Sequence, residues 1–81
     1  MKVRFTKSAR RHRIGKHRVL FIIENYEPRY LEDEIEVRAY WVAPDNQGLE
    51  LEVVAVVAGE EIVVFHVMPA RFRRGSKKWP R

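Results

Sequence analysis

Residues 49–69 read LELEVVAVVAGEEIVVFHVMP, and this stretch decides the fold. Its first five residues alternate leucine and valine with glutamate, the period of two that is typical of a half-buried strand. The residues that follow are apolar on both faces, which places this strand at the centre of a sheet. Gly59-Glu60 predicts a tight hairpin turn, and residues 62–68 predict a second strand that is apolar on both faces.

A third strand is expected just before this hairpin, over residues 35–41. Ile35, Val37, Ala39 and Trp41 face one way, and the charged or polar residues between them face the other. We therefore expect Trp41 in the core and Tyr40 on the opposite face. After Pro44, the DNQG segment predicts a loop, so the three strands form an antiparallel meander.

The first third of the chain predicts one short strand, residues 1–5, and two helices. Residues 7–14 (KSARRHRI) suit a basic helix that ends at Gly15, because glycine adopts a positive φ without strain. Residues 16–26 place apolar side chains at i, i+3, i+4 and i+7, which is one helical stripe. Residues 28–34 are expected to form a polar connection. The predicted fold is α+β, in the order β-α-α-β-β-β: a small antiparallel sheet with a helix pair packed on one face.

Charge divides the chain into three parts. All 11 acidic residues lie between Glu24 and Glu61, whereas residues 1–20 and 62–81 are basic and contain no carboxylate side chain. The formal net charge is +5. If the fold brings the two ends together, they form one strongly positive face, which would attract phosphate groups.

The 81 residues are enough for one domain. We expect that domain to cover residues 1–74, followed by a basic, flexible tail over residues 75–81. The chain has no cysteine, which excludes disulfides and fits the cytoplasm. Its apolar runs are much shorter than the roughly 20 residues of a membrane span, so no membrane association is expected.

Two segments resemble the BrnT-like branch of the RelE/ParE toxin superfamily. They are VRFTKSARRHRIGKHRV, residues 3–19, and YWVAPDNQGLELEVVAVVAGEEIVVFHVMPARFRR, residues 40–74. The resemblance implies the toxin of a type II toxin–antitoxin pair: a metal-independent mRNA endoribonuclease that inhibits translation, needs no cofactor and is neutralised by a cognate antitoxin. Its substrate would be RNA, free or on the ribosome. The oligomeric state stays open.

Metal-free RNA cleavage needs groups that transfer protons and cations that hold the charge developing on the phosphate. Histidine suits proton transfer near neutral pH, and arginine can bind two phosphate oxygens. His12 matches the family's histidine, and Arg71 matches its closing Ala-Arg pattern. We therefore expect His12, Arg71 and His66 as catalytic residues. The expected RNA-binding residues are Lys7, Arg10, Arg11, Arg73 and Arg74.

Interpretations without a catalytic or binding role also stay open for the same residues. His12 and His17 could be solvent-facing side chains of basic helices, and His66 could be a buried histidine bonded to the backbone, on the face of Val64 and Met68. The arginines after the last strand could be a solubilising tail. The three histidines have no recognised metal spacing, so no metal site is expected.

Three other functions stay open beside the ribonuclease. A non-catalytic nucleic-acid-binding domain would bind DNA and RNA in a salt-sensitive manner without cleavage. A small interaction module would dock an acidic protein on its basic ends. A ParE-like toxin directed at gyrase would share the architecture and lack RNA cleavage.

Overall fold

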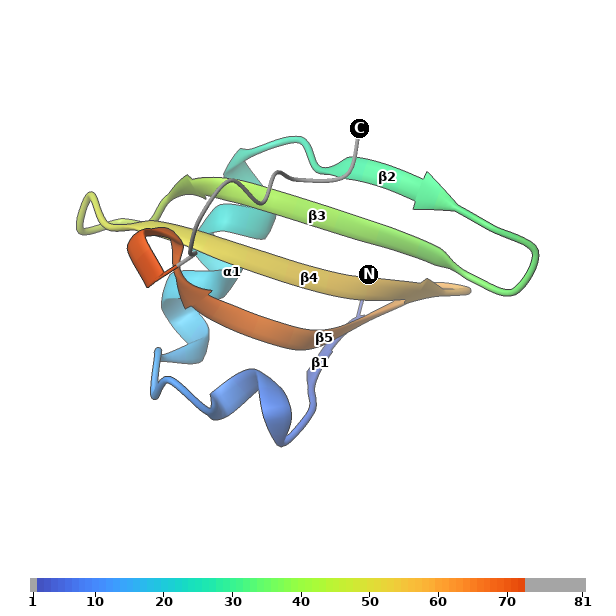
Figure 1. Ribbon diagram of the computed structural model, residues 1–81, viewed down its shortest axis with the longest axis horizontal. Helices are drawn as coiled ribbons and strands as arrows, with labels where there is room; N and C mark the ends of the chain where they lie inside the picture. The colour runs from blue at the N-terminus through green and yellow to red at the C-terminus, as the bar shows by residue number, and fades with distance from the viewer. Residues whose placement is uncertain (1, 73–81) are drawn as a thin grey trace.

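The computed structural model describes residues 2–72. Its five strands form one mixed sheet in the order β1-β5-β4-β3-β2, and α1 lies across one face of that sheet (Figure 1). The α+β class is confirmed. The elements are β1 (Lys2–Phe5), the 3-10 turn η1 (Ser8–Arg10), α1 (Lys16–Asn25), β2 (Arg29–Glu32), β3 (Val37–Pro44), β4 (Glu50–Ala58), β5 (Glu61–Pro69) and the 3-10 turn η2 (Ala70–Phe72).

The predicted meander is present, with β4 between β3 and β5 in antiparallel pairing. The central place of β4 agrees with its composition, because its middle is buried on both faces: Val53 and Ala55 on the side of α1, and Val54 at 7% exposure on the opposite side. Leu51, Val53 and Ala55 are each fully buried. The sequence predicted a wholly antiparallel sheet, but the sheet is mixed. β1 pairs in parallel with β5, and Val3 and Phe5 extend the apolar row of Ile62 and Val64.

The expected helix over residues 7–14 is wrong, and α1 is the one α-helix within residues 2–72. A single 3-10 turn, Ser8–Arg10, replaces it. Its cations lie one turn apart without carboxylates to offset their repulsion, and only Ala9 is buried, so little packing stabilises so short a helix. Gly15 also differs from its expected role: with φ −63° it is the N-cap of α1, and the positive φ, 57°, belongs to Arg13.

The connection predicted over residues 28–34 contains an additional strand, β2, which pairs with β3 at the edge of the sheet. Alternation could not reveal it, because Leu31 is its one half-buried residue and the others are exposed. The charged side chains of Arg29 and Glu32 at its ends suit an edge strand, since they discourage pairing with another chain.

The core lies between α1 and the sheet. Val19 and Ile22 of α1 pack in one cluster with Ala39, Trp41 and Ala43 of β3, whose small alanines leave room for the helix. Trp41 is 3% exposed, as expected, and its Nε1 donates to the carbonyl oxygen of Tyr26 over 3.1 Å. No helix in the described part of the chain is long and apolar enough to cross a membrane.

A β-bulge in β5 changes the direction of the residues that follow it. Val54 pairs with His66, but Ala55 pairs with Val64, so Phe65 is the extra residue. His66 therefore does not share the face of Val64, as simple alternation predicted; it shares the opposite face with Met68. We call this face, turned away from α1 and toward the viewer in Figure 1, the distal face. Its members include Arg38, Tyr40 and Val42 of β3, Glu52 and Val54 of β4, and His66 and Met68 of β5.

Candidate functional site

The basic turn η1 is held against β5 at the bulge. The Ser8 hydroxyl donates to the carbonyl oxygen of Phe65 over 2.7 Å, and the backbone N–H of Thr6 donates to the carbonyl oxygen of Val64 over 2.9 Å. Ala9 is buried against the core at 2% exposure. These contacts fix the turn so that its charged side chains point to solvent.

Lys7, Arg10 and Arg11, which the sequence predicted to bind RNA, are all exposed. Within residues 2–72, none of the three forms an ion pair. Three other described arginines, Arg4, Arg18 and Arg38, are paired with carboxylates: the guanidinium of Arg4, for example, lies 3.4 Å from a carboxylate oxygen of Glu61. The turn therefore displays positive charge that no carboxylate of the described chain offsets, which suits phosphate contacts.

The two basic ends of the chain meet at one aromatic ring. The rings of His12 and Phe72 lie edge to face with their centroids 5.6 Å apart. The guanidinium of Arg71 lies 5.2 Å from the centroid of the same Phe72 ring. Two predicted catalytic residues, His12 and Arg71, are thus brought together around a residue that the sequence did not single out. Arg73 and Arg74 lie outside the described residues, as does the tail expected over residues 75–81.

The third predicted catalytic residue, His66, has a different partner. Its Nε2 lies 3.2 Å from Oε1 of Glu52 on the distal face. The His66 side chain is 36% exposed and that of Glu52 only 7%. The interpretation of His66 as a buried histidine bonded to the backbone is therefore wrong. In a neutral imidazole that donates Nε2–H to an ionised carboxylate, the lone pair lies on Nδ1.

Glu52 is the residue that sequence reasoning missed. Alternation with leucine and valine indicated a solvent-facing glutamate, yet the residue is 6% exposed. It pairs with Met68, which makes His66 its diagonal neighbour on the same face. Counting outward from the Gly59-Glu60 turn would have paired His66 with Val53, on the opposite face from Glu52, because the bulge that moves His66 to the face of Glu52 has no signal in the alternation.

Other distal-face residues surround this pair. Tyr40, Val54 and His66 lie in one row across β3, β4 and β5. The guanidinium of Arg38 lies 5.7 Å from the Phe65 ring centroid. Hydrogen bonds to the side chains of Glu36 and then Tyr40 raise the pKa of Arg38 above its usual value. Tyr40 therefore shares the face of the pair, two strands from His66, and the Arg38 guanidinium lies against the ring of Phe65, the residue before His66.

Neither hydrogen bonds nor ring contacts join the His66–Glu52 pair to His12 or Arg71 in the described part of the chain. His17 is exposed in the first turn of α1, in line with its interpretation as a solvent-facing residue. No group of three or more potential metal ligands of the His, Cys, Asp or Glu type occurs among residues 2–72. The arrangement offers one acid–base pair on the distal face and a cluster of exposed cations near the two chain ends.

A comparison of the chain with protein-family models, curated proteins and solved structures finds no match.

Proposed function

We propose that this protein is a metal-independent endoribonuclease, the toxin of a type II toxin–antitoxin pair that acts on mRNA in the cytoplasm. The observation that carries the proposal is the contact between Nε2 of His66 and Oε1 of Glu52 over 3.2 Å. A histidine oriented by a carboxylate is the arrangement that general base catalysis uses, because the carboxylate selects the tautomer and fixes the ring.

In the proposed reaction, Nδ1 of His66 accepts the proton of a ribose 2′-hydroxyl. The 2′ oxygen attacks the adjacent phosphorus, and the bond from phosphorus to the 5′ oxygen breaks. The 5′ oxygen leaves with a proton that the protonated imidazole of His12 donates, so the products are a 2′,3′-cyclic phosphate and a 5′-hydroxyl. The carboxylate of Glu52 stabilises the imidazolium that forms. DNA is inert as a substrate because it lacks the 2′-hydroxyl.

The cations near the two chain ends bind the phosphates of the RNA. Arg71 stabilises the charge that develops on the scissile phosphate, and His12, beside it on the Phe72 ring, is the second proton-transfer group. Lys7, Arg10 and Arg11 contact neighbouring phosphates and set the position of the strand. A cognate antitoxin would neutralise the protein by covering this basic surface with an acidic segment.

The test is cleavage of a labelled RNA by the purified full-length chain and its variants, with and without ribosomes. His66→Gln should lower the rate about 10²- to 10⁴-fold, the range for loss of a general base. Glu52→Gln should lower it less, because the imidazole remains. The matched control is His17→Gln, an exposed histidine expected to leave the rate unchanged. Intact RNA in every condition, or equal rates for His66→Gln and His17→Gln, would contradict the proposal.

One observation favours a second function, a nucleic-acid-binding domain without catalysis. Lys7, Arg10 and Arg11 form their exposed cluster without any described contact to the His66–Glu52 pair. Such a surface binds a phosphate backbone whether or not an acid–base pair is nearby. This function predicts that DNA and RNA of equal length bind with similar, salt-sensitive affinity, and that His66→Gln changes neither.

A further inference from the structure

A pocket of about 270 Å³ lies at the β2–β3 edge of the sheet, lined by Glu27, Arg29, Tyr40 and Val42. Pockets for drug-sized ligands usually measure about 300–1,000 Å³, so this one suits a group no larger than a single nucleobase. We propose that it binds a guanine base of single-stranded RNA and gives the protein a sequence preference. The inference deepens the ribonuclease function proposed above and depends on it for the identity of the substrate.

Tyr40 and Val42 supply the surface on which a base would lie. Both belong to the distal face, where Tyr40 is half-buried and Val42 is 39% exposed. Unpaired bases of RNA stack on aromatic side chains, and this stacking is tolerant of sequence because every base has a π-face. Arg29, directly opposite Tyr40 in the β2–β3 pairing, is exposed and supplies a cation for the adjoining phosphate.

Glu27 supplies the discrimination between guanine and the other RNA bases. Within residues 2–72 its carboxylate forms no ion pair, not even with Arg29, which lines the same pocket. Both of its oxygens can accept hydrogen bonds. Guanine is the one common RNA base whose Watson–Crick edge presents two adjacent N–H donors, at N1 and N2. Adenine, cytosine and uracil each place an acceptor beside their donor, which would face the carboxylate unfavourably.

The register of the sheet places this pocket in line with the proposed catalytic pair. Arg29, Tyr40, Val54 and His66 are successive partners across β2, β3, β4 and β5. Tyr40 and His66 are therefore two strand spacings apart, about 10 Å. An extended RNA strand can cover this distance with a neighbouring nucleotide. A guanine in the pocket would thus place a nearby 2′-hydroxyl at His66, and cleavage would occur next to guanine.

The experiment measures binding apart from cleavage. Fluorescence anisotropy of the full-length chain is recorded with labelled 2′-O-methyl hexanucleotides, which lack the free 2′-hydroxyl needed for cleavage. One contains a single guanine, one has inosine at that position, and one has adenine. We expect the guanine oligonucleotide to bind roughly tenfold more tightly than the adenine one, because a carboxylate facing an acceptor leaves polar groups unpaired. Inosine, which lacks the N2 amino group, should fall between them.

Matched variants locate the effect. Glu27→Gln should reduce the guanine preference to within twofold, whereas Glu24→Gln, an exposed glutamate of α1 with the same charge change, should keep it. Tyr40→Leu should weaken binding of all three oligonucleotides roughly tenfold, and Tyr30→Leu, on the other face of β2, should not. Both Glu variants concern exposed side chains, so loss of folding does not complicate the result.

The outcomes separate the pocket from the catalytic function. Equal binding of the three oligonucleotides, or an unchanged guanine preference in Glu27→Gln, would overturn the proposal that the pocket binds guanine, even if unmodified RNA is cleaved. A guanine preference that Glu27→Gln removes would support it, even if unmodified RNA stays intact, in which case the ribonuclease function alone would fall.

Discussion

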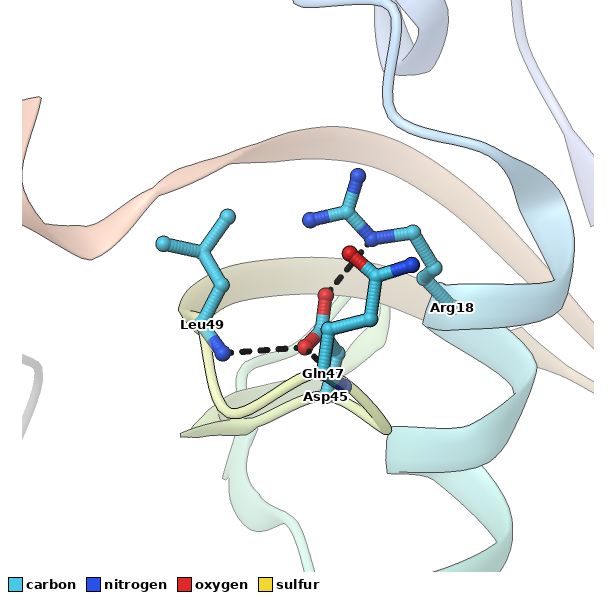
Figure 2. Close-up of polar contacts among 4 residues, drawn as sticks. All are labelled: Arg18, Asp45, Gln47 and Leu49. Atoms are coloured by element: carbon cyan, nitrogen blue, oxygen red, sulfur yellow. Dashed lines mark hydrogen bonds and ion pairs between the residues drawn. The ribbon is translucent and has the colours of Figure 1, made fainter.

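Nε of Arg18, in α1, donates a hydrogen bond of 2.6 Å to Oδ2 of Asp45, in the loop between β3 and β4 (Figure 2). The other carboxylate oxygen of Asp45 accepts the backbone N–H groups of Gln47 and Leu49, over 2.8 and 3.0 Å. The Asp45 side chain is fully buried and that of Arg18 is 18% exposed. This one carboxylate therefore closes the β3–β4 loop and ties it to the helix.

The ion pair predicts how stability depends on pH. Burial of Asp45 would raise its pKa, but the hydrogen bonds from Arg18, Leu49 and Gln47 together outweigh it and lower the pKa below its usual value. A lowered pKa means stability that is fully present above pH 4, near the unfolded value of about 3.9, and is lost as the pH falls further. Urea unfolding between pH 2 and pH 7 should show this loss.

Asp45→Asn tests the assignment. It should lower the free energy of unfolding at pH 7 by about 2–4 kcal/mol, because Arg18 is left partly buried without its partner. It should also reduce the loss of stability below pH 4. Asn46→Asp, which adds a charge in the same loop on an exposed residue, serves as a control. If the free energy of unfolding of Asp45→Asn fell as steeply below pH 4 as that of the parent chain, another group would govern this loss.

Ser8→Ala should lower the free energy of unfolding by about 1 kcal/mol, because the carbonyl oxygen of Phe65 loses the hydroxyl that bonds it over 2.7 Å. Chemical denaturation measures the change. Lys7→Ala, one residue earlier, replaces an exposed side chain that forms no hydrogen bond or ion pair within residues 2–72, and it should change stability by less than about 0.5 kcal/mol. If the two variants were equally stable, the Ser8 bond would not anchor η1.

Arg13→Gly should be more stable than Arg13→Ala by about 1 kcal/mol. Arg13 has a φ of 57°, a left-handed conformation that glycine adopts without strain and that other L-residues find unfavourable. Comparing the two variants removes the effect of losing the guanidinium, which both share. Thermal unfolding under matched conditions gives the difference, and a glycine variant no more stable than the alanine variant would mean that the loop relaxes to a different conformation.

Replacing Lys7, Arg10 and Arg11 with glutamine should weaken RNA binding and flatten its salt dependence. Each lost phosphate contact lowers the slope of log K against log salt by about 0.7 on single strands, so the triple variant should lose about 2. Arg4→Gln is the control, since that guanidinium is already paired with Glu61. Slopes that are the same for the triple variant and Arg4→Gln would place the RNA elsewhere on the surface.

The local sequence pattern was sufficient to predict the strands β3, β4 and β5, the helix α1 and the burial of Trp41. In these elements the alternation or the helical stripe is strong, and the packing agrees with it. It failed for residues 7–14, where charge repulsion and the lack of an apolar face outweigh good helix propensity. It also failed for β2, an exposed edge strand whose pairing with β3, not its composition, makes it a strand.

For the candidate site, sequence alone singled out His12, His66, Arg71 and the cations of η1, all from residue type and position in the chain. It did not determine which of them meet. The Phe65 bulge turns His66 to the distal face, β4–β5 register places Glu52 beside it, and the turn after β5 brings Phe72 against His12. Residue type limits which chemistry is available. Register, bulges and contacts between distant segments decide where each group points, because they depend on how the whole sheet pairs, which no short stretch of sequence contains.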